Sequence, residues 1–186
     1  AYLKGFLHTK NISSFQVDLG IEVILELFSS KCFLEIFEMA ETNGAEKSEN
    51  AVRILALKDA YIQCVEPVIS FLQGKKPTLA RLISSENYLP QGARFNQIDE
   101  MDWAFGTMGI QDKAKHLATL FLEDMADFIV ECIDDNFGFS RYAERLGMSA
   151  NKFDELYSHL NDKPSYIDEI AWGVLSKKIS EIQPKL

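Results

Sequence analysis

The sequence is poor in the residues from which metal centres and disulfide frameworks are built. Its 186 residues include only three cysteines and three histidines. Cys32, Cys64 and Cys132 are far apart and odd in number, and each lies in a helical pattern of apolar residues. This arrangement is typical of buried free thiols in a reducing compartment and not of a disulfide-stapled secreted domain.

Positive charge and long apolar runs are also scarce. The chain has 19 basic and 28 acidic residues, which gives a net charge of -9. Such a charge repels a phosphate backbone, so we expect no nucleic-acid partner. No stretch approaches the length of a membrane span, and the first residues lack the layout of a signal peptide, so we expect no membrane partner and a cytoplasmic location.

No set of residues forms a recognisable catalytic site. No histidine flanks a cysteine in the sequence, so none of the thiols has the neighbouring base of an activated nucleophile. Four acidic residues lie within one helical stretch: Glu123, Asp124, Asp127 and Glu131. Carboxylates in acid–base or metal-binding roles need burial or close pairing, and we expect these four on the solvated side of an amphipathic helix. The sequence therefore predicts no catalytic residue in this chain.

Two pairs of residues could in principle form a metal site between helices. Asp112 and His116 are four residues apart, and so are Glu155 and His159. A small helical metalloenzyme built on these histidines is one hypothesis. The simpler interpretation is a local surface bond within each helix, because residues four apart face the same side. We expect no metal ligand.

What the sequence does contain is helical periodicity. Apolar residues at steps of three and four predict helices over residues 1–10, 21–30, 32–40, 52–72, 112–135, 137–146, 151–160 and 164–182. Ser48 should cap the helix that follows it, and Pro67 should kink or restart that helix. One stretch alternates instead, with Phe15, Val17 and Leu19 on one side, which predicts a short strand over 13–19. The expected fold is mainly α: one irregular multi-helix domain over 1–186 with one short strand near the N-terminus.

Large aromatic residues and arginines gather in the connections that flank the predicted 112–135 helix. They are Arg94, Phe95, Trp103, Phe105, Phe137, Phe139, Arg141 and Tyr142. Connections usually lack large aromatics, so these residues either pack over the core or line a groove for a ligand or partner. Five of them are the candidate groove residues: Arg94, Trp103, Phe105, Arg141 and Tyr142.

The opening stretch carries a resemblance to a known family. The motifs AYLKGFL and SSFQVDLGIEVILELF resemble the start of cobalamin-binding-domain radical SAM proteins, with residues 1–7 matching a helix, 15–19 a strand end and 20–28 the next helix. The segments WAFGTMG, KHLATLFLEDMADFI and FGFSRYAERLG resemble a long helical insertion of some members. The resemblance implies that residues 1–30 are the remnant of an α/β unit and 31–186 a helical insertion. Ligands of doubly wound domains lie beyond the strand ends, which points to Asp18 for cofactor binding.

The chain lacks the family's cofactor motifs. The C-x-x-x-C-x-x-C motif for the iron–sulfur cluster and the D-x-H-x-x-G motif for cobalt ligation are both absent. We therefore expect a fragment that binds no cofactor alone, whose parent enzyme uses cobalamin, an iron–sulfur cluster and S-adenosylmethionine. Its partner would be the remainder of its own polypeptide, and its role would be to shape or cover the cofactor and substrate cavity. The alternative is a self-contained helical module for protein interaction, and either form could be a homo-oligomer.

Overall fold

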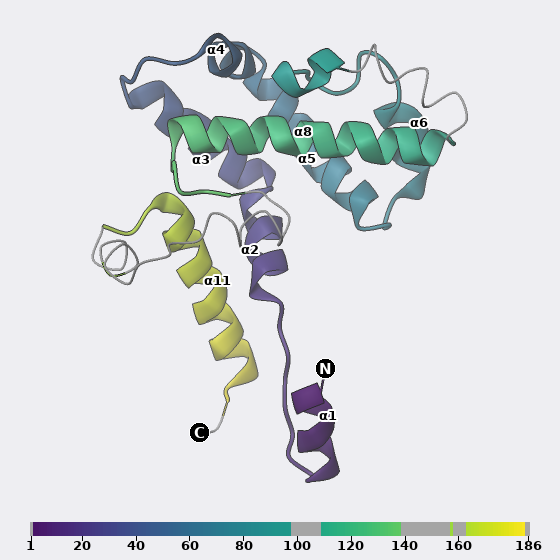
Figure 1. The fold of residues 1–186 in the computed structure, drawn as a ribbon, viewed down its shortest axis with the longest axis vertical. Helices are drawn as coiled ribbons and strands as arrows, with labels where there is room; N and C mark the ends of the chain where they lie inside the picture. Colours follow the sequence, from purple (N-terminus) through teal and green to yellow (C-terminus); the bar gives the residue numbers. More distant parts are fainter. Residues whose placement is uncertain (1, 98–108, 139–156, 158–162, 185–186) are drawn as a thin grey trace.

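The computed structural model describes residues 2–97, 109–138, 157 and 163–184, and the part it describes is helical (Figure 1). The helices, in chain order, are α1 (Tyr2–Thr9), α2 (Leu19–Leu27), α3 (Ser30–Thr42), α4 (Glu49–Ala56), α5 (Lys58–Leu72), η1 (Pro77–Leu79), α6 (Ala80–Ile83), η2 (Ala93–Gln97), α8 (Ile110–Cys132) and α11 (Tyr166–Ile182). The expectation of a mainly α, multi-helix fold is confirmed.

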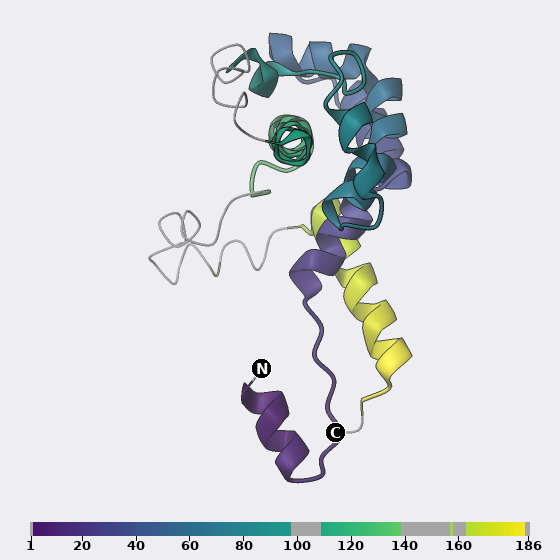
Figure 2. The same ribbon diagram turned by 90° about the vertical axis from the view of Figure 1, so that its right-hand side faces the viewer.

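Two regions differ in how they pack. The body consists of α3 to α6, the short helices η1 and η2, and α8; the arm consists of α1, residues 12–18, α2 and α11. In the body, α8 packs against α6, η2, α4 and α5, while α3 packs along α5. Figure 2 shows α8 end-on beside the layer that contains α3 and α5. The arm projects from the body, and α11 lies beside α2 in it (Figure 1).

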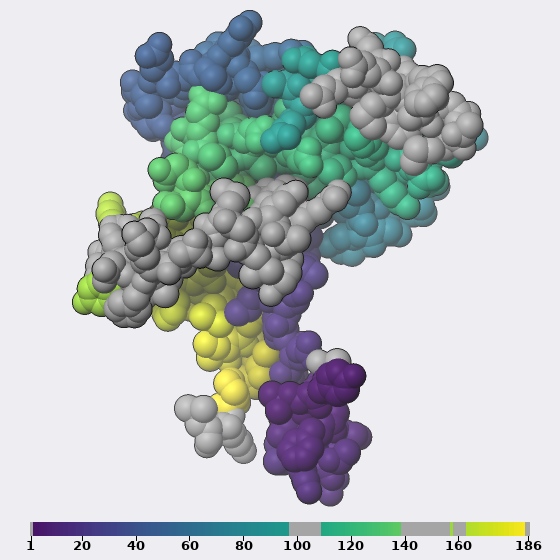
Figure 3. Space-filling view, in the orientation of Figure 1, coloured from purple at the N-terminus to yellow at the C-terminus, as the bar shows by residue number. Residues whose placement is uncertain are grey.

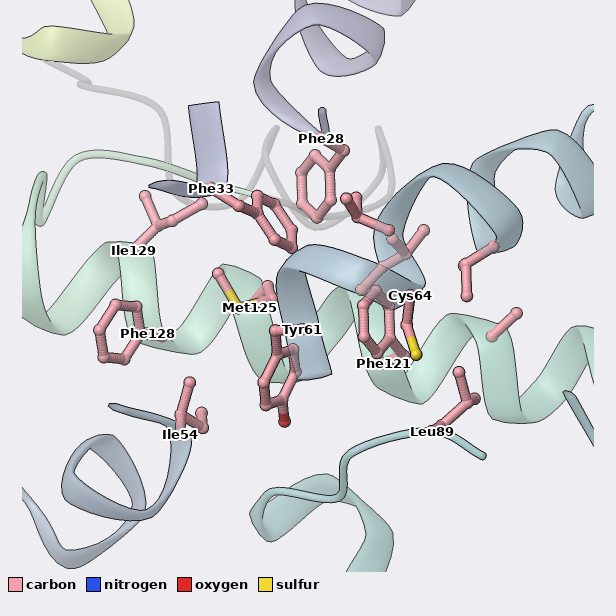
Figure 4. Close-up of a cluster of buried hydrophobic side chains, with 14 of the residues drawn as sticks. Phe28, Phe33, Ile54, Tyr61, Cys64, Leu89, Phe121, Met125, Phe128 and Ile129 are labelled. Carbon is pink, nitrogen blue, oxygen red and sulfur yellow. The ribbon is translucent and has the colours of Figure 1, made fainter. Parts of the chain in front are cut away.

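The core lies where α8 meets α3, α4 and α5 (Figure 4). Tyr61 of α5 stacks on Phe121 of α8 with ring centroids 5.2 Å apart, and Phe37 of α3 lies 5.3 Å from Phe128 of α8. All four rings are fully buried. Aromatic pairs of this kind contribute about 0.5–1.5 kcal/mol beyond the burial of their surface. The body therefore has a core of its own.

Local sequence signals explain most of the helix boundaries. Ser48 caps α4, its side chain accepting the amide of Ala51, as predicted. Ser165 begins α11 with a capping box in which its side chain and that of Asp168 each accept the other's backbone amide. Gly74 follows α5 at φ +72°, a conformation that glycine adopts without strain.

The predicted strand over 13–19 is wrong. Residues 12–18 have no regular secondary structure, and α2 begins at Leu19. The segment runs as an extended chain between α1 and α2 (Figure 1), but no strand lies beside it in the described part of the chain. The alternating pattern specifies the extended conformation, while a strand also needs a neighbour for its backbone hydrogen bonds.

The break in the predicted 52–72 helix is also misplaced. The chain restarts at Leu57, between α4 and α5, and α5 continues through Pro67. A proline removes the hydrogen bond to the carbonyl four residues earlier, which here belongs to Gln63. Gln63 is exposed, so water can satisfy that carbonyl. The helices predicted at 137–146 and 151–160 lie almost wholly outside the described residues.

Candidate interaction surface

The arm exposes large apolar side chains that a folded protein normally buries. Tyr2 is 97% exposed, Trp172 70% and Phe15 69%. The other exposed large apolar residues of the arm are Leu3, Phe6, Ile12, Val17, Leu19, Ile21 and Ile179. In the space-filling view the arm stands out from the body with its α1 end farthest away (Figure 3).

The extent of this surface is typical of an interface. At about 200 Å² for a fully exposed aromatic side chain, Tyr2, Phe6, Phe15 and Trp172 together expose about 600 Å². This sum over three segments is about as large as the largest contiguous apolar patch of an ordinary monomer. With the exposed aliphatic residues added, the arm exceeds the ~800 Å² that each partner contributes to a standard protein interface.

Two adjoining grooves shape the arm. A groove of about 990 Å³ lies between α2, α11 and residues 137–138, and its apolar lining includes Val23, Ile24, Phe137, Ile167 and Trp172. A second groove, of about 750 Å³, lies between the extended segment and the C-terminal half of α11. Its lining includes Phe15, Val17, Leu175, Ile179 and Ile182. Leu19 and Leu175 line both grooves, so they form one continuous surface.

Helix α1 is not buried against the other described elements. None of its eight residues is buried. An isolated helix shorter than about 12 residues is marginal in water, because the cost of nucleation outweighs so few hydrogen bonds. Its lasting stability therefore requires a surface on which its apolar face can pack.

A few polar contacts hold the arm to itself and to the body. Lys178 of α11 lies 3.3 Å from the Glu22 carboxylate of α2. The Tyr166 hydroxyl donates to Glu35 of α3 at 2.6 Å, and its burial, followed by this bond, raises the pKa of the tyrosine. These contacts fix α11, and Leu27 and Val174 are buried, while the apolar side chains named above are exposed among the described residues.

Asp18, the residue expected to contact a cofactor, has a structural role. Its Oδ1 accepts the amide of Ile21 at 3.2 Å, so Asp18 is the N-cap of α2. Aspartate is among the preferred N-caps because its carboxylate satisfies one of the free amides of the first turn. A role in cofactor binding stays a prediction.

Arg94, the first of the candidate groove residues, forms an ion pair in the body. Its Nε donates to Asp127 Oδ2 at 2.6 Å and its second guanidinium nitrogen to Oδ1 at 2.8 Å. The hydrogen bond to Asp127 raises the pKa of Arg94. The neighbouring Phe95 is buried in the core, which agrees with the core-packing alternative. The other four candidates, Trp103, Phe105, Arg141 and Tyr142, lie outside the described residues.

One buried carboxylate departs from the sequence prediction. Asp124 was expected on the solvated side of its helix, yet it is fully buried. It accepts the amides of Gly92 at 2.8 Å and Arg94 at 3.0 Å, and the hydroxyl of Tyr61 at 3.4 Å. Burial raises its pKa, while the two amide bonds act in the opposite direction. Asp124 holds the 92–94 turn against α8 and is a structural group.

The sequence contained a signal for this burial. Leu117, Phe121 and Phe128 of α8 are buried, and Asp124 continues their steps of four, three and four. A carboxylate on the buried face of an amphipathic helix indicates an internal hydrogen-bond acceptor. The remaining acidic residues are half-buried or exposed, and Glu131 accepts the backbone amide and the hydroxyl of Ser48.

The described residues do not form a metal site. No group of three or more potential metal ligands occurs among them. Asp112 pairs with Lys115, three residues along α8, at 3.7 Å. Glu155 and His159 lie outside the described residues.

The three cysteines are buried free thiols, as expected. Cys32, Cys64 and Cys132 belong to three different helices, α3, α5 and α8. Burial raises the pKa of the Cys64 and Cys132 thiols. A raised pKa keeps a thiol protonated and unreactive, so Cys64 and Cys132 contribute to packing.

Comparisons with known proteins identify no relative. No family model, no curated protein and no solved structure matches this chain. Among the described residues, no helix combines the length and the apolar character that are needed to cross a membrane. The exposed arm is therefore the feature from which a function has to be argued.

Proposed function

We propose that this chain is a non-catalytic helical part of a cobalamin-dependent radical SAM enzyme, in which the arm packs against the rest of the same polypeptide. The body would then help to shape or cover the cavity for cofactor and substrate. The observation that carries the proposal is the exposed apolar surface of the arm. Most of that surface belongs to residues 2–7 and 15–28, which also carry the resemblance to the family.

The chain's own residues do not fit the iron–sulfur cluster of such an enzyme. A cluster needs several thiolates close together. Here the three thiols are buried on separate helices, and no group of potential metal ligands occurs in the described part of the chain. The cofactors would therefore be held by the rest of the polypeptide, and this chain would contribute packing surface.

The test is reassembly of the enzyme from two pieces. This chain and the rest of the polypeptide encoded by its gene are produced separately and mixed, and their affinity is measured by titration calorimetry. We expect a stable complex, weakened at least tenfold by Leu3→Ser in the arm. Leu82→Ser is the matched control, because Leu82 is also an exposed leucine but lies on α6 of the body.

Two results would contradict the proposal. One is a gene that encodes nothing beyond this chain. The other is a saturable change in the visible spectrum of cobalamin at micromolar concentrations of the isolated chain, since we expect the chain alone to lack the cofactor site.

The same arm also supports a second candidate, a self-contained module that binds a separate protein. The observation in its favour is that an apolar groove accepts a partner whether or not the two chains are joined. Sedimentation and pull-down experiments separate the candidates. A stable monomer that captures one defined protein encoded elsewhere would favour this second function, and a concentration-dependent dimer would show a homo-oligomer.

A further inference from the structure

The connection between α3 and α4 contains Asn43, the one asparagine of the sequence that is followed by a glycine. At such a pair the next backbone nitrogen can attack the side-chain carbonyl carbon of the asparagine and close a five-membered ring. Gly44 has no Cβ to hinder that attack. It is exposed, and a Cβ at this position would meet no atom within 4 Å. The attacking nitrogen is therefore accessible.

We propose that Asn43 is a self-modification site, at which the chain converts this asparagine to aspartate or isoaspartate and thereby releases the end of α3 from the end of α8. The Gly44 nitrogen forms a bond to Cγ of Asn43, and the bond from Cγ to Nδ2 breaks. Nδ2 leaves as ammonia with the proton of the Gly44 amide. Water then opens the cyclic imide to give either acid. Water is the only co-reactant, and the site lies in the body, so it is independent of the function proposed for the arm.

Both reacting groups of this site are prepared for ring closure. The Gly44 amide donates no backbone hydrogen bond to another described residue, so no such bond has to break before it attacks. Asn43 Oδ1 accepts the Lys47 ammonium at 3.1 Å, and the Ala45 amide, which also donates to the Asn43 carbonyl, lies 3.4 Å from it. Negative charge develops on this Oδ1 as the ring closes, and donors aimed at such an oxygen lower the barrier. Lys47 therefore assists the reaction.

The backbone at Asn43 can rotate into the geometry of attack. Asn43 is the C-cap of α3, and the residues that follow it, 44–46, are exposed and belong to no helix. Rotation about the Cα–C bond of Asn43 therefore leaves the hydrogen bonds of α3 intact. Asn50 has the opposite arrangement, because it lies inside α4 and the amide that follows it donates to Ser48 Oγ at 3.1 Å. We expect Asn50 to keep its amide.

Conversion of Asn43 removes a contact between two helix ends. Nδ2 donates to the carbonyl of Cys132, the last residue of α8, at 2.7 Å, and the end of α3 lies near that end of α8 (Figure 1). The last carbonyls of a helix have no partner within it, so this side chain satisfies one of them. A carboxylate cannot donate to a carbonyl, and negative charge is unfavourable at a helix C-terminus. The acid therefore loses the contact.

The experiment follows the amide in the full chain. The protein is incubated at mildly alkaline pH, digested with trypsin and analysed by mass spectrometry. The peptide of residues 32–47 contains Asn43 as its only side-chain amide, and the peptide of residues 48–53 contains Asn50. We expect the first peptide to gain the mass of an amide-to-acid conversion and the second to stay unchanged.

Two lysine variants test the assistance. Lys47→Ala should slow the conversion in the folded chain about tenfold, less than the loss of a donor in a closed active site, because water can replace it in an exposed loop. In urea the same variant should convert like the wild type. Lys75→Ala, which removes another exposed lysine of the body, is the matched control and should convert like the wild type in both conditions.

Asn43→Asp mimics one product and tests the consequence. It should unfold at a lower urea concentration than Asn96→Asp, which adds the same charge at an exposed position of the body. Three results would overturn the inference: an Asn43 that keeps its amide in the folded chain but loses it in urea, equal rates for the folded wild type and Lys47→Ala, or equal urea midpoints for the two aspartate variants.

Discussion

Phe37 in the body and Phe15 in the arm are the same type of residue in opposite environments. Phe37 is buried between α3, α5 and α8 and contacts three other aromatic rings, whereas Phe15 is mostly exposed in an extended segment. The body therefore has a buried aromatic core, whereas most of the strongly exposed aromatic side chains of the described residues belong to the arm. The difference indicates that the core of the body stabilises the fold, while the arm exposes apolar side chains at the surface.

The largest effect should come from removing a ring of the body. Phe37→Ala creates a cavity in a close-packed core and should lower the free energy of unfolding by about 3–5 kcal/mol. Phe15→Ala should change it by less than about 0.5 kcal/mol, because no core packing is lost. Urea denaturation monitored by circular dichroism measures both. Equal losses for the two variants would contradict the division between body and arm.

Asp124 in the body and Asp18 in the arm both accept backbone amides, but only Asp124 is buried. Asp124→Asn leaves a buried side chain that can accept at only one oxygen, so it should destabilise the body by about 1–3 kcal/mol. Asp18→Asn should be nearly neutral, since asparagine is as good an N-cap as aspartate. Urea midpoints of the two variants check the prediction, and a neutral Asp124→Asn would remove its structural role.

Two glycines give the next comparison. A Cβ at Gly92 would lie 2.6 Å from the Asp124 carboxylate, so Gly92→Ala should cost about 1–3 kcal/mol. A Cβ at Gly20 would meet only the Asp18 carboxylate at 3.4 Å, and alanine is the better helix former, so Gly20→Ala should stabilise by up to about 1 kcal/mol. Thermal melting distinguishes the signs. If Gly92→Ala melts no lower than the wild type, the 92–94 turn is not tightly held.

The smallest effect concerns pH and arises at Cys64 in the body. Burial raises the pKa of Cys64 in the folded protein above its unfolded value, and its thiol donates to the carbonyl of Tyr88. Because the folded pKa is the higher one, the protonated thiol contributes fully to stability below the unfolded pKa of about 8.5. This contribution to the free energy of unfolding is lost as the pH rises toward the folded pKa. The free energy of unfolding should therefore fall between pH 8 and 10, and fall less steeply in Cys64→Ala. Identical slopes for both proteins would contradict the prediction.

The sequence predicts those parts of the fold that depend on local pattern. The long helix α8 is predicted because its apolar residues recur over more than six turns, and the cap at Ser48 because a single side chain satisfies it. The sequence does not predict the break at Leu57, because no glycine or proline marks it and the apolar pattern continues on both sides. Pro67 misleads for the opposite reason, since an exposed Gln63 lets the helix tolerate it.

The candidate site depends on tertiary structure and is less predictable. Alternation correctly indicates an extended chain at 13–18, but whether a strand forms depends on a partner that the local sequence does not specify. The apolar residues of α2 and α11 match an ordinary core pattern, yet Ile21, Trp172 and Ile179 are exposed while Leu27 and Val174 are buried. Asp124 could have been found from its position among Leu117, Phe121 and Phe128.

Amide hydrogen exchange on the isolated chain, and on its complex with the rest of the polypeptide, tests most directly whether the body is self-sufficient and the arm requires a partner. In the isolated chain we expect slow exchange in α5 and α8 and fast exchange in α1 and residues 13–17. Helix α1 has no buried residue. Residues 13–17 form no backbone hydrogen bond with other described residues. In the complex, α1 and residues 13–17 should become protected. A monomeric isolated chain in which α1 is as protected as α8 would contradict the account.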